Sequence, residues 1–202
     1  VVAQEIEVCS GEELGIDFNA SIGIDADTYN IIDLQLNGLT VVSVNPSLSS
    51  GLSANAISDD SFINETTAPV NVVYTVVPVS AAGCEGEEFT VTVTVSPSPV
   101  VADQDTTVNS GDVIGVVLGS DTDGAPAISN YRVTGITTGG LERGSTNSSI
   151  NDAILADGIF NDSYTNVSSS LKSVIYTLVP ISEGGCEGSE FTVTVSIRPE
   201  PV

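Results

Sequence analysis

The sequence has 202 residues, with 27 Asp and Glu against four Lys and Arg, no histidine, and a formal net charge of −23. Such a surface repels phosphate backbones and anionic lipid heads, which argues against nucleic acid as a partner and against direct membrane insertion. The missing histidine removes the usual general base, and no serine has a nucleophile-elbow pattern, so we predict no enzyme, no catalytic residue and no cofactor.

The first half of the chain predicts a series of short strands. The first covers 4–8 (QEIEV), and a turn (CSGEE) leads to a second at 14–18 (LGIDF) and a third that begins at Tyr29. The run 72–79 is apolar on both faces, as in a central strand. In 89–95 (FTVTVTV), Phe and Val alternate with Thr, which is typical of a strand with one buried face.

The second half repeats this pattern. The stretch VVYTVVPVSAAGCEGEEFTVTVTVSP around Cys84 returns as VIYTLVPISEGGCEGSEFTVTVSIRP around Cys186, 102 residues later. Six or seven short strands per copy, without helical periodicity, predict an all-β fold of two tandem immunoglobulin-like β-sandwich domains, 1–99 and 100–202, arranged end to end. An odd number of antiparallel strands would place the two ends of each domain at opposite poles.

The repeated motifs resemble a known family. Cys-Ser-Gly-Glu, a Tyr-led third strand, Asn-x-Thr/Ser, YTVxP, GCxG and FTVTV closing on Pro-x-Pro are similar to the PKD-like repeats of very large Bacteroidota surface proteins, including gliding-motility adhesins. The second copy departs from the first in one respect, because Asn109 stands where the first has Cys9. The resemblance implies extracellular, type IX-secreted, tandem stalk or adhesion modules without catalysis.

The strand order constrains the cysteines. Cys9 would follow the first strand and Cys84 would lie in the last hairpin, at opposite poles separated by about 25 Å. Because a disulfide needs Cα atoms within about 7 Å, we favour an inter-repeat Cys9–Cys186 bond, which leaves Cys84 to pair with a preceding unit. The alternative is an intradomain Cys9–Cys84 bond with Cys186 free. Non-reducing peptide mapping separates the two.

Two further groups of residues are candidates for binding or modification. Asp121 and Asp123 in DTDG have the spacing of calcium ligands, but we favour a solvated turn there, as we do for the pair Asp59 and Asp60. The sequons at Asn64 and Asn166 are candidate N-glycosylation sites. The Asp-Ser pairs at Ser61 and Ser163 are candidate O-glycosylation sites, but we favour a plain turn at all four positions, with intact mass as the check.

Three functions stay open from the sequence. The first is a non-catalytic structural repeat of a large extracellular cell-surface adhesin, which extends the chain as a semi-rigid rod and has neighbouring repeats of the same chain as its partners. The second is a module that binds surface glycans or another cell-surface protein, and the third is a spacer of a secreted hydrolase. The segments 37–56 and 138–158 differ most between the copies, so we expect partner contacts there.

Overall fold

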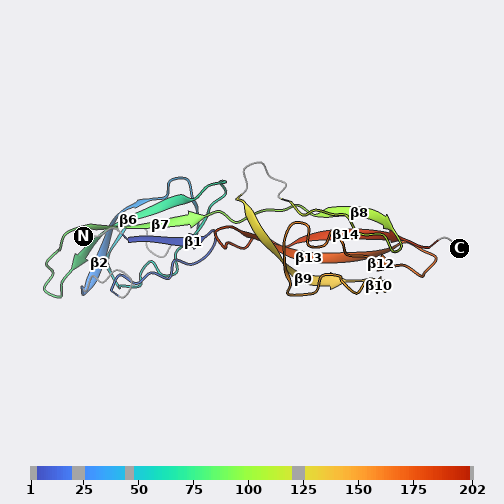
Figure 1. Cartoon of the computed structure of the whole chain (residues 1–202). Coiled ribbons are helices and arrows are strands. Elements are labelled where there is room, and N and C mark those ends of the chain that lie inside the picture. Colours follow the sequence, from blue (N-terminus) through green and yellow to red (C-terminus); the bar gives the residue numbers. More distant parts are fainter. Residues whose placement is uncertain (1–3, 20–25, 44–47, 120–125, 201–202) are drawn as a thin grey trace. The chain divides into compact units, whose positions relative to one another are not determined.

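The computed structural model describes residues 4–19, 26–43, 48–119 and 126–200 and contains strands but no helix within them (Figure 1). The chain divides into two compact units, Val1–Pro97 and Ser98–Val202. This division falls two residues before the boundary expected from the repeat. The prediction of an all-β fold with two tandem immunoglobulin-like sandwiches is confirmed.

Unit 1 is built from two sheets. The larger sheet has the strand order β1-β7-β6-β2-β4, and the smaller pairs β3 with β5. Its strands are β1 (Gln4–Cys9), β2 (Thr28–Gln35), β3 (Thr40–Ser43), β4 (Ser49–Leu52), β5 (Ser61–Ile63), β6 (Val70–Val79) and β7 (Phe89–Ser96). The segment 37–56, which the sequence left unassigned, therefore supplies one strand to each sheet.

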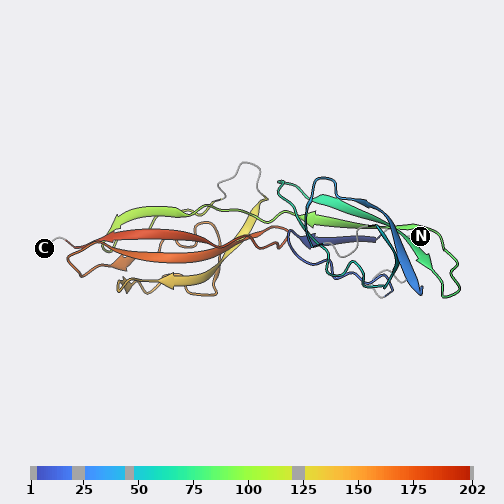
Figure 2. The same cartoon turned by 180° about the vertical axis from the view of Figure 1, so that it is seen from behind.

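Unit 2 repeats this topology strand for strand. Its larger sheet has the order β8-β14-β13-β9-β11 and its smaller sheet pairs β10 with β12. Its strands are β8 (Gln104–Asn109), β9 (Ile128–Thr137), β10 (Glu142–Arg143), β11 (Ala153–Ile154), β12 (Tyr164–Thr165), β13 (Lys172–Ser182) and β14 (Phe191–Arg198). Figure 2 shows β8, β14 and β13 side by side from the reverse side.

The first and last strands of each unit are parallel neighbours. In unit 1 the register runs from Gln4 opposite Val91 to Cys9 opposite Ser96, and β8 pairs with β14 in the same way. The other strand pairs are antiparallel. In Figure 1, β1 lies beside β7 within unit 1. Each unit therefore begins its larger sheet at one end and leaves it at the other.

The predicted alternation builds the core of each unit. In β7, Val91, Val93 and Val95 are fully buried, while Thr90 is exposed and the other threonines are half-buried. They pack with buried aromatic and aliphatic side chains into a separate core for each unit. In unit 1 the ring of Phe18 contacts those of Tyr29 and Phe89, with centroids 4.8 Å and 6.0 Å apart.

The second strand expected in each copy is not a regular strand. In unit 1, residues 14–18 make only a few backbone hydrogen bonds, to carbonyls of residues 54–60. One isolated bridge, between Glu13 and Ser61, precedes them. The physical reason lies in Gly15 and its counterpart Gly115, whose φ angles of 62° and 70° are left-handed and interrupt the extended backbone. The two segments still contribute buried side chains to their cores.

Candidate functional site

Metal ligands do not converge in the part of the chain that the structure describes. No group of three or more His, Cys, Asp or Glu side chains is placed to hold an ion there. Asp121 and Asp123 lie outside the described residues, so the calcium hypothesis stays a prediction. Asp60, in contrast, is fully buried and has a structural role. No helix long and apolar enough to cross a membrane occurs among the described residues.

The cysteines of unit 1 lie at opposite ends of its larger sheet. Cys9 ends β1 opposite Ser96, the last residue of β7, whereas Cys84 lies in the loop that leads into β7 at Phe89. Seven residue steps of about 3.3 Å give about 23 Å between these ends, far beyond disulfide reach. Cys84 is exposed and carries a free thiol, so the alternative Cys9–Cys84 bond is not formed.

Cys186 lies in the β13–β14 hairpin of unit 2 and is buried. Its backbone N–H donates to Ser182 Oγ at 3.0 Å, and its carbonyl accepts the Ser182 N–H at 2.9 Å. The same hairpin packs against the start of unit 2, because a Cβ placed on Gly188 would collide with the Pro99 carbonyl oxygen. Within unit 2, Cys186 is therefore held close to the first residues of the unit.

Each unit buries one aspartate beside a tyrosine hydroxyl. Tyr74 donates to Asp60 and Tyr176 donates to Asp162, each at 2.6 Å. Tyr176 also shares a hydrogen bond of 2.8 Å with the hydroxyl of Tyr164. The structure shows core tyrosines whose partners are carboxylates.

Burial is the largest influence on the pKa values of Tyr74, Tyr176 and Asp162. It raises the pKa of Tyr74 and of Tyr176, and the neighbouring carboxylates raise both further. Burial also raises the pKa of Asp162, against the opposing effect of hydrogen bonds from Tyr176 and Ser148. The hydroxyls therefore stay protonated and act as donors. Both aspartates are almost inaccessible to solvent, so we interpret the Asp–Tyr pairs as buried hydrogen bonds that stabilise the fold.

The sequon asparagines close a turn in each unit. The Asn64 amide nitrogen donates to the carbonyls of Ala68 and Val95 at 2.9 Å and 2.7 Å, and its oxygen accepts from Thr66. Asn166 has the same arrangement in unit 2. The side chains are 5% and 1% exposed, so a glycan on either nitrogen would prevent this turn from forming. Sequence reasoning missed this role, although the equal positions of the two sequons indicated it.

The candidate O-glycosylation serines differ in accessibility. Ser61 is 5% exposed, so a glycan there would require the surrounding β3–β5 pair to open. Ser163 is half-buried, and its backbone N–H donates to Asn147 Oδ1 at 3.0 Å. Modification at either serine stays a prediction that intact mass would test.

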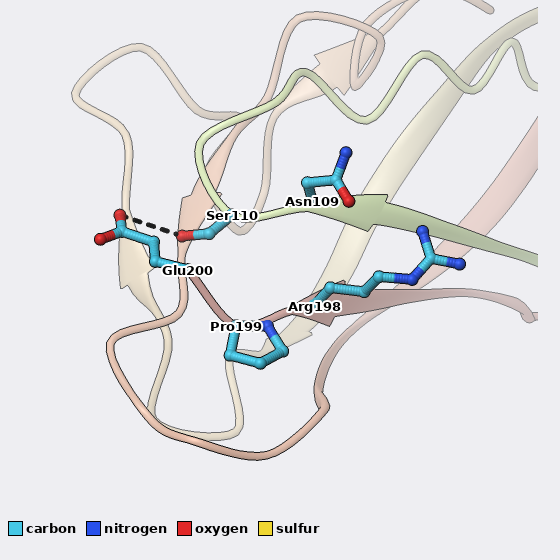
Figure 3. A pocket seen from close by; sticks show the side chains of 5 residues that line it. All are labelled: Asn109, Ser110, Arg198, Pro199 and Glu200. Carbon is cyan, nitrogen blue, oxygen red and sulfur yellow. Dashed lines mark hydrogen bonds between the residues drawn. The ribbon is translucent and has the colours of Figure 1, made fainter. Parts of the chain in front are cut away.

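One shallow pocket lies at the end of β8 and β14 in unit 2 (Figure 3). It has a volume of about 370 Å³ and is lined by Asn109, Ser110, Arg198, Pro199 and Glu200. The Ser110 hydroxyl lies 3.4 Å from a Glu200 carboxylate oxygen, longer than the usual O–H···O range of about 2.5–3.0 Å. These groups do not form the nucleophile and base pair that covalent catalysis requires.

A family profile described as PKD-like domain matches residues 6–99 and 126–201. The chain belongs to the PKD-like domain family. The first matched segment covers nearly all of unit 1, and the second covers unit 2 from residue 126 onward, so each unit contains one PKD-like domain. This confirms the family part of the resemblance. No curated protein matches the chain.

Solved structures with some similarity to the two PKD-like domains include cadherin repeats. The human protocadherin-24 EC1-2 structure is 15% identical and has a TM-score of 0.31, covering 96% of this chain and 95% of that chain. The Clostridium thermocellum CbhA fibronectin(III)-like modules are 15% identical, with a TM-score of 0.31 and coverages of 98% and 91%. Chicken VE-cadherin EC1-2 is 13% identical, with a TM-score of 0.28 and full coverage of both chains.

The features that the two PKD-like domains share are structural ones. Both keep the buried Asp–Tyr pair, the asparagine turn and the parallel pairing of first and last strands. The pocket, in contrast, is lined by residues that differ between the domains, because Cys9 and Ser96 occupy the places of Asn109 and Arg198. What is common to both domains thus maintains the fold and the direction of the chain.

Proposed function

We propose that this chain is a pair of non-catalytic structural repeats from a large extracellular cell-surface adhesin, and that it extends its parent as a semi-rigid stalk. The observation that carries the proposal is the parallel pairing of the first and last strands within each unit. A chain that enters a domain at one end of a sheet and leaves at the other advances with every repeat. A domain whose ends lay side by side would not extend the parent chain.

The advance per unit follows from the strand register. From Gln4 to Ser96 the chain moves along the shared β1–β7 ladder by five residue steps, because Cys9 lies opposite Ser96. At about 3.3 Å per residue this gives about 17 Å along the strand direction, before the connection to the next domain is added. Unit 2 has the same register between β8 and β14. The length of the parent chain would therefore increase with the number of repeats.

The scarcity of exposed aromatic rings favours a stalk over a carbohydrate-binding module. Nine of the ten Tyr and Phe side chains are buried, and Phe160 is 37% exposed. Sugar-binding surfaces usually present aromatic faces to the ring of the ligand. A glycan array probed with the intact chain tests this, and specific binding to a sugar would favour the alternative function.

We further propose that Cys9 forms a disulfide with Cys186. Cys9 lies opposite Ser96, one residue before the end of unit 1, and the Cys186 hairpin packs against Pro99 near the start of unit 2. Ser96 and Pro99 are three residues apart, a reach of at most about 11 Å. Such a bond would restrict bending at the connection and requires an oxidising compartment, in agreement with the proposed extracellular location.

Peptide mapping without reductant tests this bond directly. The expected result is one fragment that joins the Cys9 and Cys186 peptides, with Cys84 open to alkylation. A fragment joining Cys9 to Cys84 would contradict the proposal.

Small-angle scattering with and without reductant tests the stalk itself. We expect an elongated particle whose flexibility increases when the disulfide is reduced. The Cys9→Ser variant should behave like the reduced protein, while Cys84→Ser serves as the control and should behave like the parent. A compact particle in both states would contradict the proposal.

A further inference from the structure

Unit 2 exposes a group of apolar side chains on its smaller-sheet side. Val113, Val117, Leu155 and Phe160 are 50%, 59%, 65% and 37% exposed. We name these four side chains the apolar patch. Single exposed apolar residues are common on protein surfaces, whereas a contiguous group of them is a candidate interaction surface.

Backbone hydrogen bonds bring the two segments of the apolar patch together. The Gly115 N–H donates to the Phe160 carbonyl at 2.9 Å, and the Leu118 N–H donates to the Ala156 carbonyl at 2.7 Å. Val113 forms a bridge with Ser163. Residues 113–118 and 155–163 therefore run beside one another, and residues from both contribute to one exposed face.

The apolar patch does not belong to the core of its unit. Ile114, Leu118 and Ile159 are the neighbours that point inward, and all three are at most 3% exposed. Val113, Val117 and Phe160 alternate with these residues along the chain and point to the other side. Their hydrophobicity therefore adds little to the stability of the unit.

Unit 1 provides an internal comparison, because it has the same backbone without the apolar patch. The Gly15 N–H donates to the Ser58 carbonyl at 2.8 Å, the Phe18 N–H donates to the Ala54 carbonyl at 2.8 Å, and Glu13 bridges Ser61. The positions equivalent to the apolar patch are occupied in unit 1 by Glu13, Asp17, Ser53 and Ser58. The fold thus accepts polar residues at all four positions, so it does not require the apolar ones in unit 2.

The surroundings of the apolar patch are acidic. Asp112, which precedes Val113, and Asp157, between Leu155 and Phe160, are both exposed. The two cations nearest in sequence have partners of their own, because Arg143 donates to the carbonyls of Asn147 and Ser148 and Lys172 donates to the carbonyl of Gly139. With a net charge of −23 for the whole chain, this face attracts a partner with positive charge.

Size and charge together argue against a second copy of this chain as the occupant. Four partly exposed side chains offer on the order of 300 Å² of apolar surface, within the range of patches on monomeric proteins. A stable dimer buries about 1,200 Å² or more, and two chains of this charge repel each other.

We propose that the apolar patch of unit 2 binds a segment of another protein in which apolar side chains are interspersed with lysine or arginine. The apolar side chains of that segment would cover Val117, Leu155 and Phe160, while its cations would face Asp112 and Asp157. This assigns the two repeats different roles, with unit 1 a spacer and unit 2 a docking module. The inference goes beyond the stalk function and does not depend on it, because a compact or an elongated chain would present the same patch.

Amide chemical-shift mapping of the intact chain tests the proposal, with an alternating Lys-Val peptide as the probe. We expect shifts at residues 113–118 and 155–160, none at 13–18 and 53–58, and weaker binding as salt rises. Glu-Val and Lys-Ser peptides are the controls for charge and for hydrophobicity, and neither should bind. Equal shifts in both units, or binding of the Glu-Val peptide, would overturn the proposal.

Variants that exchange residues between the units sharpen the test. Val113→Glu, Val117→Asp, Leu155→Ser and Phe160→Ser together give unit 2 the residues of unit 1 and should weaken peptide binding about tenfold or more, with the melting temperature unchanged. Val167→Ser with Leu171→Ser removes two exposed apolar side chains elsewhere in unit 2 and should leave binding unchanged. If the fourfold variant binds as the parent does, the patch is not the site. Concentration-dependent dimerisation of the parent that the fourfold variant abolishes would assign the patch to a second copy and overturn the proposal.

Discussion

At the scale of single residues, we expect the hydrogen bonds to the buried carboxylates to matter for stability. Tyr176→Phe removes the hydroxyl that donates to Asp162 and contacts Tyr164, and leaves a buried carboxylate short of a partner. We expect this to lower the free energy of unfolding of unit 2 by about 1–3 kcal/mol, since an unsatisfied buried polar group bears its full desolvation penalty. Urea unfolding followed by amide signals of unit 2 measures it.

The control is another buried tyrosine of the same unit. Tyr131 is 3% exposed and packs edge-on against Phe191, outside the Asp162 network. Tyr131→Phe keeps this ring contact and should change the stability of unit 2 less than Tyr176→Phe does. Equal effects of the two substitutions would mean that the carboxylate partner is unimportant.

Asp162 also predicts a dependence of stability on pH. Because burial raises its pKa in the folded state, the protonated form is favoured there, and the stability it contributes is complete below the ordinary aspartate pKa of about 3.9. This contribution is lost as the pH rises through the raised folded value. Wild-type unit 2 should therefore lose stability relative to Asp162→Asn as the pH increases over this window. Urea midpoints of both proteins at a series of pH values check the prediction, and a constant difference between them would contradict it.

Sequence reasoning did not find these pairs because the composition hid them. With 27 acidic residues in the chain, no single aspartate stands out, and burial depends on how the turn at 57–62 folds over the sheet. A signal was nevertheless present, because both copies keep an aspartate fourteen residues before the tyrosine of the central strand. The equal spacing of aspartate and tyrosine in both copies indicates a contact between them, which the residue types alone do not.

At the scale of secondary structure, the β13–β14 hairpin depends on one glycine. A Cβ at Gly188 would collide with the carbonyl of Pro99, which is backbone and moves only with the whole segment. We expect Gly188→Ala to destabilise unit 2 by about 1–3 kcal/mol, as overpacking typically does. Gly184→Ala in the same hairpin meets nothing closer than 3.8 Å and is the matched control. Thermal unfolding of both variants tests this, and equal melting temperatures would contradict it.

The regular strands were predictable, but their partners and interruptions were not. Alternating Phe, Val and Thr identified β7 and β14, since period-two burial is a local property of the chain. Residues 14–18 look equally like a strand, yet the left-handed Gly15 interrupts it, and glycine in a sequence does not reveal its φ. The parallel pairing of β1 with β7 joins segments more than 80 residues apart, which no local pattern specifies.

At the scale of the whole molecule, each unit has the parts needed for independent folding. The core of unit 1 contains residues from Leu14 to Val95 and that of unit 2 residues from Val101 to Ile197. We expect Val1–Pro97 and Ser98–Val202, expressed separately, each to give a dispersed amide spectrum and a cooperative thermal transition. A fragment without such a transition would show that its stability depends on the other unit.

The repeat was the most informative property of the sequence for the fold and the least informative for the site. Two copies in register established the domain count and, with the motifs, the family. The same focus on shared residues concealed what differs between copies, such as Phe160 against Ser58 or Asn109 against Cys9. Only the backbone hydrogen bonds reveal that residues 113–118 and 155–160 share one surface.

The parallel neighbours at the start and finish of each unit also determine how it bears load. If a stalk is pulled from its two ends, β1 and β7 are drawn in opposite directions along their common axis. The hydrogen bonds between Gln4–Cys9 and Val91–Ser96 then resist sliding together, instead of breaking one after another as they would in a hairpin peeled from its open end. In the stalk that we propose, tension would therefore load the hydrogen bonds between the first and last strands of each domain in shear.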